Sequence, residues 1–455
     1  MKIDAQTLGN SNFQAFFSTK YSYYAGSMYK GISSKEMVIA LSKSGLLGFL
    51  GTGGMGLKEI EEDLKTISTE LDEYSPYGAN ILQSHNDAEL EDKLVSLFLK
   101  YNVRTVEASS YMSLSPALVR FCCTGLKSGL DGGVFRTNRI IAKVSRPEVA
   151  HIFMSPPPKE VLSRLVELNQ ISIEEAELAA QIPIASAICI ESDSAGHTDS
   201  GISFAQFPTI KALRDAITAE KQYLQPILIG MAGGIGTPDA VSAAFIMGAD
   251  FVATGSINQC SVEAAISDDV KNILQSIDIN DTAYAPSGEL FEMGSKVQVV
   301  KKSSLFSIRA NKLYQLYQQY SSLEDIDPST IKELETKYFL RTIDQVWCET
   351  RDHYLKIAPS VIERAEKRPK SKMALIFKWY FIHTTRAALK GSDEYNGDLQ
   401  IHCGPALGAF NQIVKGGPIA QWQNRRVVDI ASFLMNEASD NLNQFWAKHQ
   451  YLEST

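Results

Sequence analysis

Short apolar runs alternate with amphipathic segments along the first part of the chain, up to about residue 256. In 57–67, for example, leucine and isoleucine recur at helical spacing and form one apolar face. Eight β-type runs occur in this part, and nearly all of them precede a segment with a helical pattern. Because strands that alternate with helices form parallel sheets, the pattern predicts an α/β fold, a (β/α)8 TIM barrel. The predicted strands are 23–28, 46–51, 77–82, 105–109, 139–145, 184–192, 226–232 and 250–256.

Two parts of the chain depart from this alternation. The segment 154–181 opens with "MSPPPKE" and continues with two amphipathic helical patterns, so we predict a helical insertion between the fifth and sixth strands. Glycine is absent from 301–390, and all four tryptophans lie beyond residue 340. This shift in composition predicts two domains, a TIM barrel in 1–300 and a mainly helical region in 301–455.

Composition narrows the class of protein. The 455 residues carry a net charge of −8, with 44% hydrophobic and 21% charged residues, which is ordinary for a globular protein. The negative charge argues against nucleic acid or an anionic membrane surface as the main partner. No apolar run approaches the roughly 18 residues that span a bilayer, and no signal peptide is evident. The six cysteines show no zinc-ligand spacing. We therefore expect a cytoplasmic protein without a metal site.

The stretch "GLLGFLGTGGMG" (45–56) contains the spacing G-x-G-x-x-G. A dinucleotide-binding domain needs an acidic residue about 20 positions further on, at the end of the next strand. Asp72 and Glu73 are at that distance, but they lie in a predicted helix end and turn. Two other interpretations stay open. The glycines either close a tight turn between strand and helix, or they let a flat ligand approach the mouth of a barrel.

The strongest local signal is "PILIGMAGGIGTPDAVSAAFIMGADFVATGS" (226–256). One predicted strand ends in Gly233 and Gly234, and the next ends in Gly255 and Ser256. Bare backbone N–H groups at two adjacent strand ends can bind a phosphate, which in TIM barrels sits after strands 7 and 8. The strand count places these glycines there. Ordinary tight turns are the alternative interpretation.

Polar side chains near other strand ends are candidates for chemistry. His197 follows the sixth strand, where it can donate a proton or orient a substrate oxygen. Asp193 and Asp199 either orient its ring or serve the turn. Lys143 lies in an otherwise apolar strand, where burial is costly unless it is paired. It either faces a negatively charged reduced cofactor or extends to water. Asn80 is a further polar candidate at the barrel mouth.

Several motifs in order resemble one flavin-dependent family over about residues 20–300. They are "AGSM", "LLGFLGTGGMG", "PYGANIL", "DSAGHTDS", "IGMAGGIGTPDA" and "FVATGS". The family includes nitronate monooxygenases and FMN-dependent enoyl-acyl-carrier-protein reductases. The chain is still more similar to the PfaD-like trans-acting enoyl reductases encoded with polyketide and polyunsaturated fatty acid synthases. Their helical extension resembles "LFSIRANKLYQLYQQYSSLEDI", "VWCETRDHY", "KMALIFKWYF" and "CGPALGAFNQIVKG".

The resemblance implies an FMN-dependent enoyl reductase that uses NADPH or NADH as reductant. His197 aligns with the active-site histidine of the family, and Ala195 stands where the family often has glycine. The 45–56 glycines would then close a turn near the flavin. The cofactor-binding residues implied in the same way are Ala25, Gly26, Ser27 and Met28 beneath the isoalloxazine, Asn80 and Lys143 at its polar edge, and Ala195, Gly196, Gly233, Gly234, Gly255 and Ser256 around the phosphate.

The resemblance also implies a partner, the acyl carrier protein domain of a synthase. The helical region and the 154–181 insertion would shape the acyl tunnel and dock the carrier, and a homodimer is the expected oligomer. Carrier domains are acidic, so "RAEKRPKSK" (364–372) is either a docking patch or a solvated basic loop. Three alternatives remain for the function: a flavin oxidase of the nitronate monooxygenase type, a flavin-free phosphate-binding barrel such as an isomerase or an IMP-type dehydrogenase, and a non-catalytic scaffold.

Overall fold

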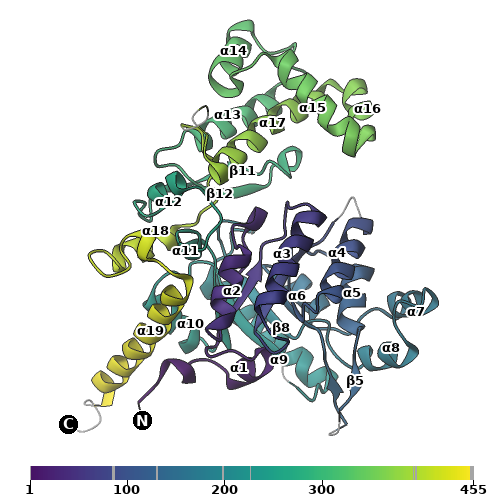
Figure 1. Cartoon of the computed structure of the whole chain (residues 1–455), viewed down its shortest axis with the longest axis vertical. Coiled ribbons are helices and arrows are strands. Elements are labelled where there is room, and N and C mark those ends of the chain that lie inside the picture. The colour runs from purple at the N-terminus through teal and green to yellow at the C-terminus, as the bar shows by residue number, and fades with distance from the viewer. Residues whose placement is uncertain are drawn as a thin grey trace. The chain divides into compact units, whose positions relative to one another are not determined.

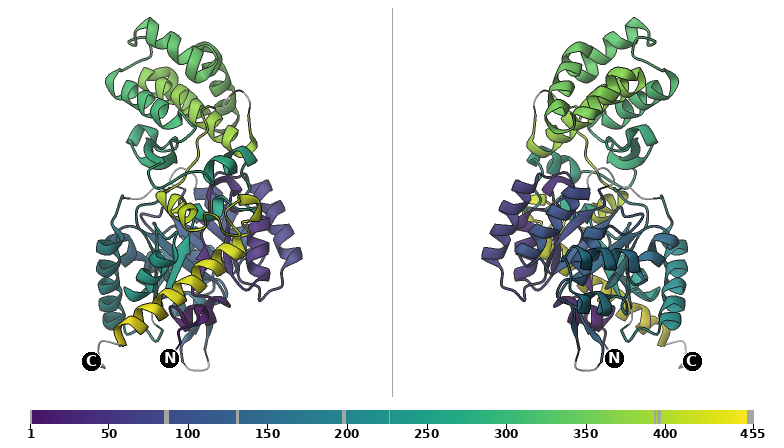
Figure 2. Two further views of the ribbon diagram at one scale, coloured as in Figure 1. Left: turned by 90° about the vertical axis from the view of Figure 1, so that its left-hand side faces the viewer. Right: turned by 90° about the vertical axis from the view of Figure 1, so that its right-hand side faces the viewer.

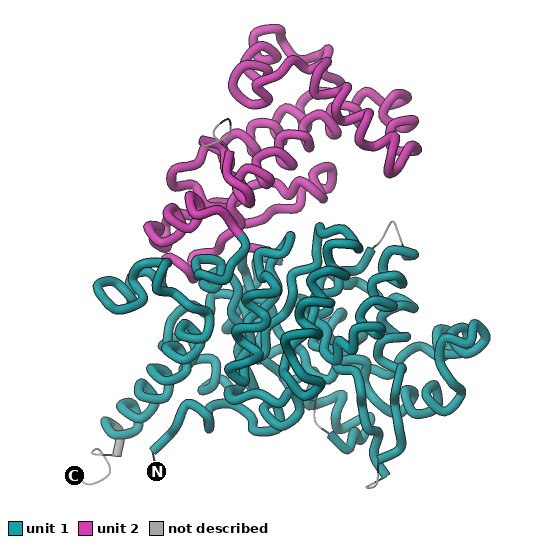
Figure 3. The backbone as a smooth tube through the Cα atoms, in the orientation of Figure 1, with its two compact units in different colours: residues 1–194, 198–265, 409–455 teal, residues 195–197, 266–408 magenta. Residues whose placement is uncertain are grey.

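The computed structural model describes residues 2–84, 88–129, 132–196, 199–225, 227–392, 394 and 397–450, with residues 449 and 450 described by their backbone alone. The chain divides into two compact units (Figure 3). Unit 1 comprises residues 1–194, 198–265 and 409–455, and unit 2 comprises residues 195–197 and 266–408.

Unit 1 contains a closed barrel of eight parallel strands (Figure 1), which confirms the predicted TIM barrel. Each of the eight predicted runs supplies one strand. The strand order around the barrel is β1-β10-β9-β8-β7-β4-β3-β2. The strands are β1 (Tyr23–Ala25), β2 (Leu47–Leu50), β3 (Tyr77–Leu82), β4 (Thr105–Ser109), β7 (Arg139–Val144), β8 (Ala187–Glu191), β9 (Leu228–Ala232) and β10 (Phe251–Thr254).

Helices follow the strands as the amphipathic pattern predicts. In order they are α2 (Lys35–Lys43), α3 (Leu57–Glu70), α4 (Ala88–Lys100), α5 (Pro116–Cys123), α6 (Pro147–Phe153), α9 (Ser203–Lys221), α10 (Pro238–Ile246) and the short α11 (Ser256–Gln259). Two further helices, α7 (Lys159–Glu167) and α8 (Ile173–Ala179), lie between β7 and β8 and form the predicted helical insertion. A small hairpin, β5 (Lys127–Ser128) and β6 (Val134–Phe135), precedes β7.

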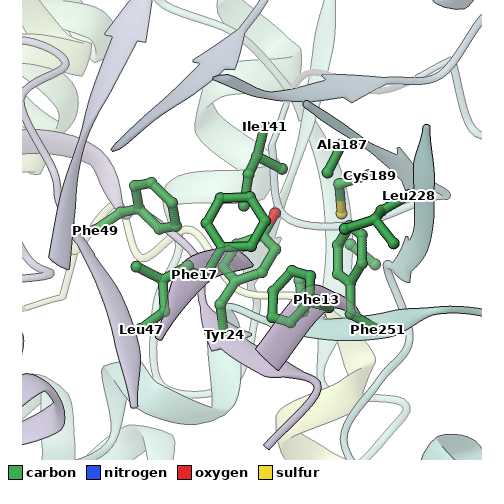
Figure 4. Packing of buried hydrophobic residues seen from close by; sticks show 12 residues of the cluster. Phe13, Phe17, Tyr24, Leu47, Phe49, Ile141, Ala187, Cys189, Leu228 and Phe251 are labelled. Carbon is green, nitrogen blue, oxygen red and sulfur yellow. The ribbon is translucent and has the colours of Figure 1, made fainter. Parts of the chain in front are cut away.

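An apolar cluster lies inside the barrel and extends to its N-terminal end, where α1 (Ser11–Phe17) and the first residues of several strands contribute to it (Figure 4). Phe13 and Phe17 come from α1, a helix that the sequence pattern did not predict. The ring of Phe13 stacks on that of Phe251 with centroids 4.5 Å apart. Leu47, Leu228 and Phe251 are the first residues of their strands. Because α1 and these residues occupy one end of the barrel, the carboxyl ends of the strands remain for a site.

Unit 2 consists of helices and one antiparallel hairpin. The elements are α12 (Asp268–Leu274), β11 (Thr282–Pro286), β12 (Lys296–Val300), α13 (Phe306–Gln319), α14 (Pro328–Glu333), the π-helical turn Leu334–Phe339, α15 (Ile343–Ile357), α16 (Pro359–Lys367) and α17 (Pro369–Lys390). Half of the residues of the long helix α17 are buried, and Phe381 on it contacts the rings of Phe291 and Phe306. No helix in the described ranges is long and apolar enough to cross a membrane.

The division into units differs from the one that composition suggests. Unit 2 begins at residue 266 rather than near 301, and residues from 409 onward rejoin unit 1. The last helix, α19 (Val427–Gln450), is the long yellow helix in Figure 2. It packs against α10, and the Ser242 hydroxyl of α10 donates to the Ala438 carbonyl at 3.1 Å. A helical period in the sequence does not say which surface covers the apolar face of a helix such as α19. The connecting helix is α18 (Pro405–Ile413).

Candidate active site

The loop after β1 is fixed by backbone contacts at the carboxyl end of the barrel. The Gly26 N–H donates to the Thr254 carbonyl of β10 at 2.9 Å. The Ser27 N–H donates to the Glu107 carboxylate at 3.0 Å, and the Met28 N–H donates to the Ser33 hydroxyl at 2.8 Å. The segment from Ala25 to Met28 therefore has a defined shape at the position where the resemblance predicts the flavin ring.

The glycine-rich stretch after β2 packs against this loop. A Cβ atom on Gly51 would lie 1.8 Å from the Met28 carbonyl oxygen, so only glycine fits there. The Gly31 N–H donates to the Gly51 carbonyl at 2.8 Å, and the Lys30 N–H donates to the Gly53 carbonyl at 2.7 Å. Because β2 is a strand of the barrel, the dinucleotide-binding interpretation of 45–56 is excluded. These glycines let two loops at the barrel mouth approach each other.

Gly233 and Gly234 follow β9 in the left-handed region, with φ of +84° and +75°. A Cβ on Gly233 would lie 2.6 Å from the Ser192 carbonyl oxygen, whereas one on Gly234 would meet no atom within 4 Å. Gly255, after the adjacent strand β10, has the same open space, and Ser256 begins α11. Two open backbone positions therefore lie at adjacent strand ends, which is the arrangement an anion needs to reach backbone N–H groups.

Asn80 lies in β3 with its side chain held by β4. Its amide nitrogen donates to the Glu107 carbonyl at 3.0 Å and to the Ser109 hydroxyl at 3.2 Å. The Thr52 hydroxyl donates to the Asn80 carbonyl at 2.7 Å, which ties β3 to the glycine-rich loop after β2. These hydrogen bonds fix the orientation of the Asn80 side chain, which the sequence predicts to lie at the barrel mouth.

Lys143 in β7 is paired inside the barrel. Its Nζ lies 2.9 Å from Glu191 Oε1 and 3.9 Å from Glu107 Oε1. Burial by itself would lower the pKa of Lys143, but the carboxylates of Glu191 and Glu107 outweigh it and raise that pKa above its usual value. Lys143 is therefore an ammonium held between two carboxylates, and it does not extend to water as the alternative interpretation proposed.

Glu107 and Tyr24 were not identified from the sequence. Glu107 lies on β4 with no exposed surface, and the Tyr24 hydroxyl donates to its carboxylate at 3.2 Å. Burial, with smaller contributions from Cys189 and Glu107, raises the pKa of Tyr24 well above its usual value, so this hydroxyl remains a donor. The signal was present in "TVEAS" (105–109), since a carboxylate in an apolar strand needs a partner as much as Lys143 does.

The remaining predicted residues are only partly placed. Ala195 and Gly196 follow β8 in the chain and are grouped with unit 2, so their part in holding a phosphate stays a prediction. His197 lies outside the described residues. Asp199 contacts Arg146 at 2.6 Å, and this hydrogen bond lowers the pKa of the carboxyl. The described part of the chain contains no cluster of potential metal ligands.

Two family models match the chain. Residues 10–284 match nitronate monooxygenase, and residues 320–399 match the inserted helical domain of [acyl-carrier-protein] S-malonyltransferase. The polyketide biosynthesis protein PksE of Bacillus subtilis is 49% identical over 97% of this chain and 57% of its own length. One component of the polyunsaturated fatty acid synthase of Thraustochytrium is 40% identical over 90% of this chain and 28% of its own length. This chain thus spans about half of PksE and less of the Thraustochytrium protein.

Among solved structures, the enoyl reductase domain of MlnA from the macrolactin cluster of Bacillus amyloliquefaciens superposes with a TM-score of 0.94. It is 45% identical, and the alignment covers 97% of this chain and 99% of that domain. The chain belongs to the nitronate monooxygenase family, in the PfaD-like enoyl reductase branch found with polyketide and polyunsaturated fatty acid synthases.

Proposed function

We propose that the protein is an FMN-dependent enoyl reductase that uses NAD(P)H to reduce 2-enoyl thioesters carried by an acyl carrier protein. The observation that carries this proposal is the open backbone at Gly234 and Gly255, at adjacent strand ends beside the ordered loop after β1. The MlnA enoyl reductase domain, similar over nearly its whole length, supports the reaction.

The described residues fit FMN. Gly233, Gly234, Gly255 and Ser256 would hold the phosphate, because no side chain fills the space above Gly234 and Gly255. The segment Ala25–Met28, with Asn80 and Lys143, would hold the ring. When bound, FMN would supply the hydride chemistry that amino-acid side chains lack.

The protein's own groups would orient the substrate and supply a proton. Reduction adds a hydride at Cβ and a proton at Cα, and the developing enolate oxygen needs hydrogen-bond donors. His197 remains our proposed proton donor, or the group that holds the thioester carbonyl, on the basis of its place after β8. Lys143 is already balanced by Glu191 and Glu107, so it would act as a fixed donor rather than as an uncompensated charge.

The helical unit supports a carrier-linked substrate. Part of it matches a helical domain of an enzyme named for acyl carrier protein, and a small nitronate would need no such unit. The match of residues 10–284 to nitronate monooxygenase keeps a flavin oxidase as the second candidate. The two candidates differ in what reoxidises the reduced flavin, an enoyl thioester or oxygen.

An anaerobic visible spectrum would separate these candidates. We expect NADPH to bleach the flavin bands of the holoprotein and a 2-enoyl thioester to restore them before air is admitted. Restoration by air alone would support the oxidase. A protein that shows no flavin bands even after FMN is added would contradict the proposed cofactor.

The basic stretch 364–372 is only partly available to a partner. Lys370 donates to the Tyr317 and Tyr320 carbonyls, and Lys372 lies over the Trp347 ring at 5.1 Å. Arg364, Lys367 and Arg368, at the end of α16, are exposed. These three side chains are therefore the proposed contacts for an acidic carrier domain.

Reversing the charge of this exposed trio should weaken the carrier interaction. For the triple variant Arg364→Glu, Lys367→Glu and Arg368→Glu, we expect KM for a carrier-linked enoyl thioester to rise about tenfold, since rim charges act mainly on association. The kcat value should stay within about twofold. A short N-acetylcysteamine thioester, which lacks the carrier, should show unchanged kinetics and serves as the control. An unchanged KM for the carrier-linked substrate would place docking elsewhere.

A further inference from the structure

The carboxylate of Glu107 reaches across the interior of the barrel. Glu107 belongs to β4, whereas Tyr24 and Ser27 belong to β1 and the loop that follows it. In the closed sheet, β2 and β3 separate β1 from β4 on the shorter path. The contact therefore joins two non-adjacent strands through the space that they enclose.

Both oxygens of the Glu107 carboxylate accept hydrogen bonds. Oε2 accepts the Ser27 N–H at 3.0 Å and also the Ser27 hydroxyl. Oε1 accepts the Tyr24 hydroxyl at 3.2 Å and lies 3.9 Å from Lys143 Nζ. Hydrogen bonds to an ionised carboxylate are stronger than those between neutral groups. Because one of the donors is a main-chain N–H, the bond constrains the backbone of the loop as well as a side chain.

The groups around Glu107 favour a carboxylate that accepts hydrogen bonds from the loop after β1. Lys143 lies closer to Glu191 than to Glu107, and the Ser194 hydroxyl also donates to Glu191, at 3.2 Å. On the other side of the loop, the Gly26 N–H donates to the Thr254 carbonyl. A Cβ on Gly26 would lie 3.3 Å from Glu107 Oε1, so the carboxylate packs closely under the loop. Two main-chain N–H groups of the loop therefore donate hydrogen bonds. Gly26 donates to the main chain of β10, and Ser27 donates to the Glu107 side chain of β4.

We propose that Glu107 is a positioning residue that fixes the loop after β1 in the shape that receives the flavin ring. This inference rests on the proposed function, because the loop Ala25–Met28 is the expected seat of the isoalloxazine. Glu107 acts through Ser27 and need not contact the cofactor. Its loss should therefore weaken FMN binding more than a loss of fold stability alone explains.

The chain offers a matched control in Glu91. This carboxylate of α4 is also buried, and it accepts the same three kinds of donor: the Ser84 N–H at 3.3 Å, the Tyr111 hydroxyl at 2.6 Å and the Ser115 hydroxyl. The variants Glu107→Gln and Glu91→Gln therefore alter carboxylates with matched hydrogen-bond donors, one across the barrel interior and one outside it, and only Glu107 also lies near a lysine, Lys143.

The test measures FMN affinity by fluorescence titration of the full-length apoprotein, and the melting temperature of the same apoprotein. We expect Glu107→Gln to weaken FMN binding about tenfold, which corresponds to one charge-assisted hydrogen bond. Glu91→Gln should change the affinity less than about twofold, although it also lowers the melting temperature. The visible absorption maximum of bound flavin should also shift in Glu107→Gln alone.

A second variant covers the case in which Glu107→Gln does not fold. Glu107→Asp keeps the charge but withdraws the carboxylate from Ser27, and we expect a similar loss of FMN affinity. Wild-type affinity in Glu107→Asp, or in Glu107→Gln where that variant folds, would overturn the positioning role, as would an equal loss in Glu91→Gln. A wild-type protein that binds no FMN would instead overturn the proposed function.

Discussion

Replacing Gly234 by Asp should weaken FMN binding by at least about a hundredfold without unfolding the barrel. A Cβ at this position meets no atom within 4 Å, and aspartate tolerates the left-handed φ of +75°. The new carboxylate would occupy the space proposed for the phosphate. Two like charges about 4 Å apart repel by about 4 kcal/mol at a partly screened site, which exceeds a hundredfold in affinity.

Gly234→Asn is the matched control for this experiment. Asparagine has nearly the same size and the same tolerance of left-handed backbone, but no charge. Titration of apoprotein with FMN should give a much smaller loss for Gly234→Asn than for Gly234→Asp. Equal affinity of Gly234→Asp and the wild type would show that the phosphate binds elsewhere.

The second large effect concerns Lys143 and the stability of the apoprotein. Lys143→Met removes the ammonium that lies between Glu107 and Glu191 and leaves both carboxylates without it. Breaking a buried ion pair in this way costs about 3 to 5 kcal/mol. We expect the midpoint of urea denaturation to fall accordingly. The double variant Lys143→Met with Glu191→Gln should recover part of this loss.

The pH dependence of this effect has a defined sign. Because the folded protein raises the pKa of Lys143, the stability that Lys143 contributes is fully present below the ordinary lysine pKa and is lost only above it. The wild-type contribution should therefore not change between pH 5 and pH 8.

Lys93→Met provides the surface control for Lys143→Met. Lys93 pairs with Glu89 on α4, and their side chains are 57% and 77% exposed. Such a pair contributes less than about 1 kcal/mol, so the denaturation midpoint should barely move. A loss in Lys143→Met no larger than in Lys93→Met would contradict the assignment of a lysine paired inside the barrel.

The fold was largely predictable because alternating strands and helices imply a parallel barrel. Each of the eight predicted strands was found, since short apolar runs bounded by glycine and polar residues mark buried strands well. The contribution of Phe13 and Phe17 to the apolar cluster inside the barrel was not predicted, because α1 is too short to give a clear helical period. The return of α19 to unit 1 could not be predicted, because one apolar face fits many partners.

The part of the candidate site that could be predicted is the part formed by backbone groups rather than by side chains. Glycines after β9 and β10 mark open strand ends directly in the sequence, and the structure gives Gly234 and Gly255 free space. The contact between Glu107 and Ser27 depends instead on which strands face each other across the barrel, and no local pattern encodes that. The sequence left open whether Lys143 faces a negatively charged cofactor or extends to water, and its partners Glu107 and Glu191 emerged only with the strand order.

Because α19 belongs to unit 1 but lies at the end of the chain, its position has a consequence for folding during synthesis. The Gly233–Gly234 turn leads into α10, and α10 packs along α19, whose Ala438 accepts the bond from Ser242. Roughly 180 residues separate these helices. At 5–20 residues per second, the ribosome therefore needs about 10 to 40 seconds after α10 to synthesise α19, the helix that packs on it. During this interval the nascent barrel exposes an apolar helix surface. Unit 2 is made in the meantime, so α10 is covered by α19 only after unit 2 has been synthesised.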